Sequence, residues 1–422
     1  MQLAHKIRLT PTADQEVYFW QASGTARKTW NWALDEWNKQ YAAGKKPSAA
    51  SLKKQFNAIK YDLFPWMKGI HRDAHAQPFA FLGKAWNKFF SDIKAGKKAN
   101  EPQFKKKGKC KDSFYVANDK FRVDGFTVVL PIIGKVIMTE KLRFQGKIMS
   151  GTVSRTANKW FLSIQVDVPE SQAWKPRTGD AIVGVDLGIK AAATLSTGES
   201  IKAPKPLKKA LRRLRIRQRS ISRKLEAAKV KVGLKPKQRI PKGTKIPVSL
   251  NRKKASEAVA RLHVHIASIR KNFLHKITTR ICRENQTIVI EDLNVAGMLK
   301  NDKLSRAISD IGFGEFRRQL EYKKLIFGND LIIADRWFPS SKLCSVCGWK
   351  NDALQLKDRE WVCHECGTIH DRDVNAAVNL EQLPVASSSE GENVGKDTPV
   401  SYEPRPVRNS ERELTVNTSV HF

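Results

Sequence analysis

The sequence predicts a multidomain α/β protein that carries one metal-binding module. The β-branched runs at residues 181–185 and 287–290 have the length and composition of buried strands. Long stretches between and around them repeat apolar residues at steps of three and four, as amphipathic helices do. Two Cys-x-x-Cys pairs, fifteen residues apart, follow near the C-terminus. A chain of 422 residues has room for roughly two to four domains.

The chain is strongly basic. It contains 77 Lys and Arg against 41 Asp and Glu, a formal net charge of +36. Such a field attracts polyanions, and binding them releases counterions. Nucleic acid is therefore the first partner to expect.

Membrane insertion and a disulfide framework are both disfavoured. The most apolar stretch, residues 126–138, is interrupted by Pro131 and Lys135 and is shorter than the ~20 residues of a spanning helix. The N-terminus lacks the apolar core of a secretory signal. Four of the six cysteines have metal-ligand spacing, and Cys110 and Cys282 have no evident partner. We therefore expect a cytoplasmic protein with no membrane partner.

The N-terminal third combines helical and strand-like patterns. Residues 5–9 alternate as a short strand, and residues 13–41 have helical periodicity. Two helical segments carry apolar residues on one face, namely Trp30, Leu34, Trp37 and Tyr41 in the first and Leu82, Trp86, Phe89 and Ile93 in the second. This spacing favours a core position over base stacking for their tryptophans. Short strand-like segments between residues 113 and 168, with Gly and Asn turns, are typical of an antiparallel β-barrel.

Two segments concentrate positive charge. Residues 201–280 hold 26 Lys and Arg but only two acidic residues, Glu226 and Glu257. Their apolar periodicity predicts a long helical hairpin at about residues 205–285. A coiled-coil arm explains the apolar positions but not the one-sided charge, so we expect the arm to lie along a nucleic-acid backbone. Its candidate contacts are Arg212, Arg213 and Arg215.

The second basic segment, residues 94–111, holds eight lysines and one glutamate. It is equally typical of a solvated, mobile face and of a phosphate contact. The candidate contacts are Lys105, Lys106 and Lys107.

The two Cys-x-x-Cys pairs predict a structural zinc site. Each pair places two thiolates on a tight turn, and two pairs complete a tetrahedral site with no open coordination position. We expect one Zn²⁺ that stabilises a fold and performs no chemistry. The predicted ligands are Cys344, Cys347, Cys363 and Cys366.

Three carboxylates have a common context. Asp186 and Glu291 follow β-branched runs, and Asp373 lies where a loop enters a predicted helix just past the cysteines. A carboxylate in an apolar setting is costly unless it is neutralised. If the three converge, they can hold two Mg²⁺ ions, which activate water and stabilise the leaving 3′ oxygen of a phosphodiester.

Each carboxylate also has a simpler explanation. Asp186 can be a turn residue before Gly188, and Glu291 can be an ion-pair partner at a strand end. Asp371 or Asp373 can be a helix N-cap. A coincidence of all three in a strongly basic chain, with a zinc module beside the third, is improbable.

At these residues the sequence resembles the TnpB (OrfB) family of transposon-encoded RNA-guided nucleases, the relatives of type V CRISPR effectors. The resemblance covers residues 1 to about 383. It rests on five motifs in a fixed order: GVDLGIK at 184–190, IEDL at 290–293, SDIGFGEFRRQLEYK at 309–323, FPSSKLCSVCG at 338–348 and HDRDVNAA at 370–377.

The resemblance implies an RNase H-like RuvC domain that is split in the sequence, with Asp186, Glu291 and Asp373 as catalytic acids and magnesium ligands. It also implies an N-terminal helical recognition domain, a barrel and a zinc-ribbon insertion. The expected boundaries are 1–11 and 103–175 for a wedge-like barrel, 12–102 for the helical domain, 176–340 for the RuvC-like domain with its hairpin, 341–369 for the zinc ribbon and 370–384 for the final RuvC segment. Residues 385–422 are expected to be a disordered tail because they lack periodic apolar content.

The implied activity is Mg²⁺-dependent, RNA-guided DNA cleavage by a monomer that holds one guide RNA from the transposon end. The barrel and the helical domain would grip the guide RNA and read a short motif flanking the target DNA. Pairing by the guide would select the target sequence. Two alternatives are an RNA-guided DNA-binding repressor that does not cleave, which the complete acidic set disfavours, and a transposase, which the zinc module before the third acid disfavours.

Overall fold

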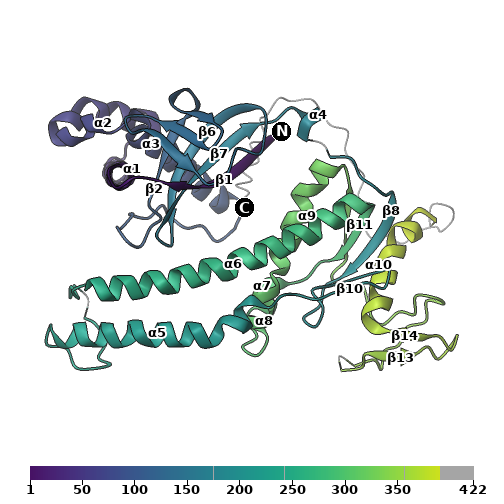
Figure 1. Ribbon diagram of the computed structural model, residues 1–422. Coiled ribbons are helices and arrows are strands. Elements are labelled where there is room, and N and C mark those ends of the chain that lie inside the picture. The colour runs from purple at the N-terminus through teal and green to yellow at the C-terminus, as the bar shows by residue number, and fades with distance from the viewer. Residues whose placement is uncertain (174, 242, 356, 390–422) are drawn as a thin grey trace. The chain divides into compact units, whose positions relative to one another are not determined.

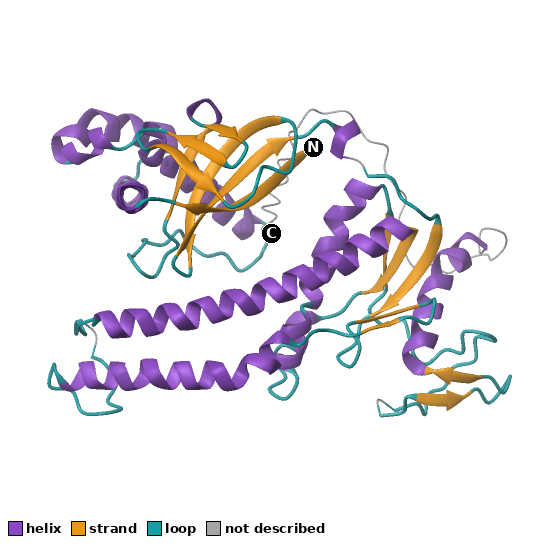
Figure 2. Cartoon of the chain, viewed as in Figure 1, coloured by secondary structure: helices purple, strands orange, loops and turns teal. Residues whose placement is uncertain are grey.

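The computed structural model describes residues 1–173, 175–241, 243–355 and 357–389. These residues form two compact units, Met1–Glu170 and a second unit that begins at Ser171 (Figure 1). A short helix, α4 (Glu170–Ala173), lies where one unit gives way to the next. Figure 2 shows that both units combine helices with a sheet, in agreement with the predicted α/β class.

The first unit is built on a seven-stranded antiparallel sheet of order β2-β6-β7-β1-β5-β4-β3. The strands are β1 (Gln2–Thr10), β2 (Ser113–Ala117), β3 (Arg122–Asp124), β4 (Thr127–Leu130), β5 (Gly134–Met138), β6 (Lys147–Thr156) and β7 (Lys159–Asp167). The N-terminal strand β1 lies in the middle of the sheet, where Ile7 pairs with Leu162 and Leu9 with Met138. These four side chains are buried, as the period of two along a half-buried strand requires.

The predicted barrel is wrong in one respect, because the sheet does not close among the described residues. Strands β2 and β3 remain edges of the sheet. Side chains at the start of α3 occupy the free edge of β2 instead of a strand: His71 Nε2 lies 2.9 Å from Tyr115 O, and Ala117 N donates to Asp73 Oδ2 at 2.9 Å. These contacts occupy two backbone groups that a closing strand would need.

The helices of the first unit are α1 (Ala13–Ala42), α2 (Ala49–Leu63) and α3 (Arg72–Lys94), with the 3-10 turns η1 (Pro65–Gly69) and η2 (Asn118–Lys120). Thr12 and Gln15 form a capping box at the start of α1. The predicted aromatic core is confirmed, since Trp30, Trp37 and Trp86 are buried and Trp37 stacks on Trp86 at 5.4 Å between ring centroids. Tyr41 and Ile93, at the ends of the pattern, are exposed.

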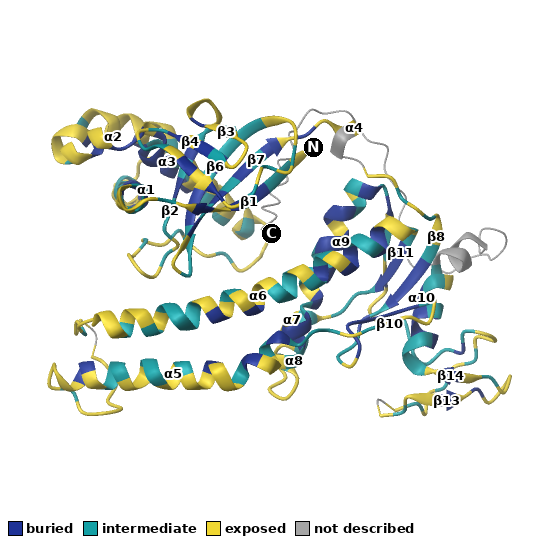
Figure 3. Ribbon diagram, in the orientation of Figure 1, coloured by how far each residue is buried: buried dark blue, intermediate teal, exposed yellow. Residues whose placement is uncertain are grey.

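The second unit contains a five-stranded sheet of order β10-β9-β8-β11-β12. Its strands are β8 (Ala181–Asp186), β9 (Ala193–Leu195), β10 (Ser200–Ile201), β11 (Asn285–Glu291) and β12 (Asp330–Ala334). Strands β8, β11 and β12 are parallel, and β9 and β10 run antiparallel at one edge. The interior of β8 and β11 is buried (Figure 3), as expected for parallel strands that are covered on both faces.

Helices cover the two faces of this sheet. Val185 and Ile290 pack with α6 and α9 in the main core, and Val289 on the opposite face packs with Leu380 of α10. The helices of this unit are α5 (Pro206–Val230), α6 (Leu250–Glu284), α7 (Val295–Met298), α8 (Ser305–Ile311), α9 (Phe313–Phe327) and α10 (Arg372–Ser389). Within the described residues, no helix is both long and apolar enough to cross a bilayer.

Helices α5 and α6 form the predicted hairpin and run side by side (Figure 1). Buried Leu214 packs against Leu262 and Ile266. The base of the hairpin is fixed by the buried carboxylate of Asp310 in α8. It accepts hydrogen bonds from the first backbone amides of α5 and pairs with Arg270 of α6 at 3.2 Å.

Residues 308–327, which the periodicity predicts as one helix, are two helices. Gly312 separates α8 from α9 with a left-handed φ of 84°, a conformation that glycine adopts without strain.

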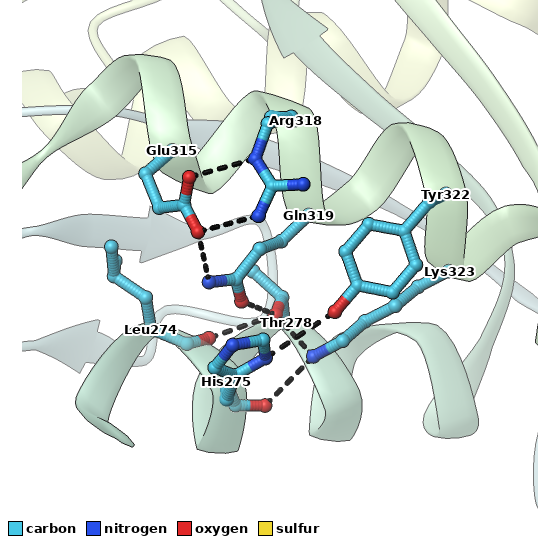
Figure 4. A network of polar contacts seen from close by, with 8 residues as sticks. All are labelled: Leu274, His275, Thr278, Glu315, Arg318, Gln319, Tyr322 and Lys323. Carbon is cyan, nitrogen blue, oxygen red and sulfur yellow. Dashed lines mark hydrogen bonds and ion pairs between the residues drawn. The ribbon is translucent and has the colours of Figure 1, made fainter. Parts of the chain in front are cut away.

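A buried polar network joins α9 to α6 (Figure 4). Lys323 Nζ donates to His275 O at 2.9 Å and to the hydroxyls of Thr278 and Thr279 at 2.7 Å. Thr278 Oγ1 also donates to Gln319 Oε1 at 2.8 Å, and Gln319 is completely buried. Burial lowers the pKa of Lys323 to about 8.

The C-terminal part of the second unit contains a small cysteine module and α10. The module has a two-stranded sheet, β13 (Glu360–Val362) and β14 (Ile369–Asp371). Asp371 Oδ1 accepts hydrogen bonds from Asp373 N at 3.0 Å and Val374 N at 2.9 Å, so Asp371 is the N-cap of α10. The predicted tail begins within this helix, because α10 continues to Ser389, and residues 390–422 lie outside the described residues.

Candidate active site and metal centre

Asp186 and Glu291 end two neighbouring parallel strands. Val185 of β8 is the register partner of Ile290 in β11, so the next residue of each strand emerges at the same edge of the sheet. The carboxyl ends of parallel strands are where α/β sheets place ligand-binding groups. The preceding residues are apolar and buried, which fixes both strands in register.

Helix α10 brings Asp373 to the same edge. The helix packs directly on the backbone of β8 at Gly184, where an added Cβ would collide with the carbonyl oxygen of Ala377 and lie 2.6 Å from Glu381 N. Only glycine permits this approach. Asp373 lies one turn before Ala377, in the first turn of α10.

The electrostatics of Asp186 link the three carboxylates. The pKa of Asp186 is raised to about 8, mainly because the carboxyl group is buried and also because the negative charges of Glu291 and Asp373 lie nearby. Arg372 and Arg359 act in the opposite direction. The three acids therefore share one electrostatic environment in which a bound cation would relieve their mutual repulsion.

Two residues that sequence reasoning missed hold Glu291 in place. Ser340 Oγ donates to Glu291 Oε1 at 2.5 Å, and Asn379 Nδ2 of α10 donates to the backbone carbonyl of Ser340 at 2.7 Å. Both are buried. Ser340 lies in the FPSS sequence at residues 338–341. The position of this motif, between a predicted strand and the cysteines, was the only feature of the sequence that could have indicated a role for Ser340.

Ion pairs surround the carboxylates. Arg359 Nη1 lies 3.3 Å from Asp373 Oδ1. Asp292, next to Glu291, pairs with Arg317 at 2.6 Å and with Arg336, and these two arginines lower the pKa of Asp292. Asp292 is thus neutralised by side chains of this unit, whereas Asp186 and Glu291 form no ion pair with a described residue.

The donor set fits Mg²⁺, which prefers carboxylate oxygens and retains several waters. Among the described residues, the four cysteines are the one set of three or more candidate ligands with all ligand atoms within 4.8 Å of one another, and Asp186, Glu291 and Asp373 do not form such a set.

The four predicted cysteines come together and fit a zinc site. Their sulfur atoms all lie within 4.8 Å of one another, with Cys344 3.6 Å from Cys366 and Cys347 3.5 Å from Cys363. Gly348 and Gly367, with φ of 77° and 69°, follow the two Cys-x-x-Cys turns. Four thiolates with no open position are the ligands of a structural Zn²⁺.

Asparagines of α10 connect the cysteine module to the carboxylates. Asn375 Nδ2 donates to Leu343 O at 2.6 Å, and its Oδ1 accepts from Ser345 N at 3.0 Å. These backbone groups flank Cys344, so an ordered cysteine module fixes the first two turns of α10. Asp373 is part of the first of these turns.

The basic candidates differ in their surroundings. Arg212, Arg213 and Arg215 are exposed on α5 and form no ion pair or hydrogen bond with another described residue. Lys106 and Lys107 are also exposed. Lys105 is half-buried, and its Nζ makes a cation–π contact 3.8 Å from the centroid of the Trp30 ring.

Comparisons with known proteins place this arrangement in a class of transposon-associated proteins. Family models match residues 163–302 ("Probable transposase"), residues 313–380 ("Cas12f1-like, TNB domain") and residues 1–46 ("Helix-turn-helix domain"). In this chain residues 1–46 form a strand and one long helix.

Two relatives align with nearly the whole chain. A protein of Streptomyces pristinaespiralis named "Putative RNA-guided DNA endonuclease" is 35% identical over 97% of this chain and 93% of its own. The "Putative RNA-guided DNA endonuclease InsQ" of Escherichia coli (strain K12) is 30% identical over 95% of this chain and 97% of its own. The solved structure of CasPhi-2 (Cas12j) bound to crRNA is 12% identical, with a TM-score of 0.41, over 91% of this chain and 98% of that one. The chain belongs to the TnpB (OrfB) family of RNA-guided DNA endonucleases.

Proposed function

We propose that this protein is an RNA-guided, Mg²⁺-dependent DNA endonuclease whose RuvC-like nuclease domain is built on the sheet β8–β12 and helix α10. The single observation that carries the proposal is the convergence of Asp186, Glu291 and Asp373. Adjacent strand ends and the first turn of α10 supply them, and the pKa of Asp186 responds to the other two. The family membership of the chain supports the same activity.

In this mechanism Asp186, Glu291 and Asp373 would hold two Mg²⁺ ions. When bound, Mg²⁺ supplies an activated water and neutralises charge on the leaving 3′ oxygen. Ser340 orients Glu291 by occupying Oε1, which leaves Oε2 as the free oxygen. Arg359 holds Asp373 from the cysteine-module side. The zinc module acts only through the position of α10.

Basic surfaces of the chain bind the nucleic acids. The exposed arginines Arg212, Arg213 and Arg215 on α5 contact phosphates of the guide RNA or of its duplex with the target. Lys106 and Lys107 are candidates for a second contact. The protein reads the shape and backbone of the guide–target duplex, while base pairing selects its sequence.

A cavity of about 680 Å³ in the first unit is the candidate reader of the flanking DNA motif. It lies between α2, α3 and β2. Alanines form part of its lining, and its polar side chains are Lys53, Asn57, Arg72, Asp73, Gln77 and Tyr115. Arginine, lysine, asparagine and glutamine are the side chains that read base edges in a DNA groove.

The test uses the full-length protein purified with its copurifying RNA. The 3′ segment of that RNA defines a target, which is placed beside a library of flanking sequences and incubated with Mg²⁺. We expect cleavage that requires the RNA, a matching target and one flanking motif. Asp186→Ala should abolish cleavage and retain target binding.

Two results would contradict the proposal. Binding without any cleavage by the wild-type protein would identify an RNA-guided repressor. Joining of DNA ends in the absence of RNA would identify a transposase.

A further inference from the structure

Trp337 is the most exposed tryptophan that the structure describes. Its exposed fraction is 84%, whereas Trp66 is 50% exposed and the other described tryptophans are buried or half-buried. Tryptophan is highly buried on average, because its large ring gains more from leaving water than most side chains do. An indole held in solvent next to an acidic site therefore suggests a ligand.

The backbone that carries Trp337 is fixed by the same sheet as the carboxylates. Ala334, the last residue of β12, is the register partner of Glu291. Trp337 follows it by three residues, on a tight turn in which Asp335 Oδ1 accepts from Trp337 N at 2.8 Å and Asp335 O accepts from Phe338 N at 3.1 Å.

Both flanks of this turn contact the acidic edge. On one side, Arg336 pairs with the carboxylate of Asp292, and its Nε donates to Asp292 O at 3.3 Å. On the other side, Phe338 packs in the cluster of Val289 and Leu380, and Ser340 binds Glu291. The backbone on both sides of Trp337 is therefore anchored, on one side to Asp292 and on the other to Glu291. The ring itself is exposed and contacts no other ring among the described residues.

We propose that Trp337 stacks on a base of the DNA strand that enters the carboxylate site, and so fixes which phosphodiester is cut. This inference rests on the proposed nuclease function. A nucleobase is the fitting occupant because the protein carries a net charge of +36, and because Arg336, the residue before Trp337, and Arg317 both pair with Asp292 next to Glu291. Any base can stack on an aromatic ring. Such a contact suits an enzyme whose guide RNA, and not its protein, selects the target sequence.

Trp337 is a positioning residue in this proposal. It touches the strand next to the scissile phosphate but takes no part in proton transfer. Its removal should therefore affect where the strand is cut as well as how fast. A purely structural role would change the rate alone.

The first measurement uses the RNA-bound Asp186→Ala protein, which binds the target without cutting it. A 2-aminopurine base is placed at successive positions of the strand to be cut. With Trp337 present, we expect fluorescence quenching at one or two adjacent positions. Trp337→Leu, which keeps an apolar side chain, should lose the quenching, and Trp337→Tyr should keep part of it.

The second measurement maps the cut sites and rates of variants with Asp186 intact. Trp337→Leu should cut roughly 5- to 150-fold more slowly at the main site and spread over neighbouring phosphodiesters. Trp337→Tyr should restore the single main site.

An unchanged quenching profile and cut site in Trp337→Leu would overturn the inference and leave the ring as a surface for a protein partner. Quenching without cleavage by the wild-type protein would support stacking but contradict the nuclease function, so the two failures are distinguishable.

Discussion

Ser340 Oγ donates a hydrogen bond to Glu291 Oε1 at 2.5 Å, and the backbone carbonyl of Ser340 accepts one from Asn379 Nδ2 of α10. This contact links a strand end, the segment before the cysteine module and α10 in one place. A hydroxyl that occupies one carboxylate oxygen fixes the orientation of the other.

Ser340→Ala should therefore weaken the site without unfolding the protein. We expect the cleavage rate at limiting Mg²⁺ to fall roughly 10- to 100-fold, with partial recovery at high Mg²⁺. Cleavage rates measured over a range of Mg²⁺ concentrations test this. Ser341→Ala is the matched control, because Ser341 makes no side-chain hydrogen bond with another described residue. Equal rates for the two variants would mean that Ser340 does not position Glu291.

Gly184→Ala should displace α10 from the sheet. The new methyl group would meet the carbonyl oxygen of Ala377, and overpacking of this kind costs roughly 1–3 kcal/mol of unfolding free energy. We expect a lower melting temperature and loss of cleavage, because Asp373 moves with the helix. Gly314→Ala in α9 is the control, since no atom lies within 4 Å of its added Cβ. Full activity in Gly184→Ala would contradict the packing argument.

Cys347→Ser should release zinc. A thiolate site with three sulfur ligands binds less tightly, so the zinc content should fall from about one ion per chain to well below that. Cleavage should fall as well, because Asn375 ties the cysteine module to α10. Elemental analysis of the purified protein measures the first effect, and Cys110→Ser is the control. Retained zinc would argue against the four-cysteine site.

Reversing the charge of Arg212, Arg213 and Arg215 to Glu should weaken binding of RNA or of the guide–target duplex. If each arginine contacts one phosphate, the slope of log K against log salt should become shallower by about 2–3. Titrations at several salt concentrations measure the slope. Arg217→Ala is the control: Arg217 donates to Ala258 O at 2.7 Å across the hairpin, so its loss should cost about 1 kcal/mol of stability and leave the slope unchanged. An unaltered slope in the triple variant would mean that these arginines face solvent.

Lys323 should make stability depend on pH between about 8 and its unfolded value near 10.5. Burial lowers the folded pKa, so the unfolded chain binds more protons in this window and the free energy of unfolding should rise with pH. Glu315, Cys282 and Lys175 also act on Lys323, so the informative quantity is the difference from Lys323→Met. Urea denaturation at several pH values measures it. A rise of equal size in the variant would assign the effect to other groups.

Composition and local sequence patterns were sufficient to indicate the class of partner and the metal module. The charge of +36 points to nucleic acid, and the cysteine spacing defines a metal module whose four sulfur atoms do come together. Local periodicity gave the helical hairpin and the tryptophan core, because amphipathic spacing is a property of consecutive residues. The strand ends at Asp186 and Glu291 followed from the same kind of pattern.

The residues that assist the carboxylates could not be identified before the packing of the strands and helices was known. The hydrogen bond from Ser340 to Glu291, the clamp of Asp310 on the hairpin and the close approach at Gly184 each join segments separated by many residues, and no periodicity encodes them. The failure of the sheet to close at β2 also depends on a long-range contact, because side chains at the start of α3 bond to backbone groups on the free edge of β2. Long-range contacts depend on how elements pack, so they emerge only when every strand and helix has found its neighbours.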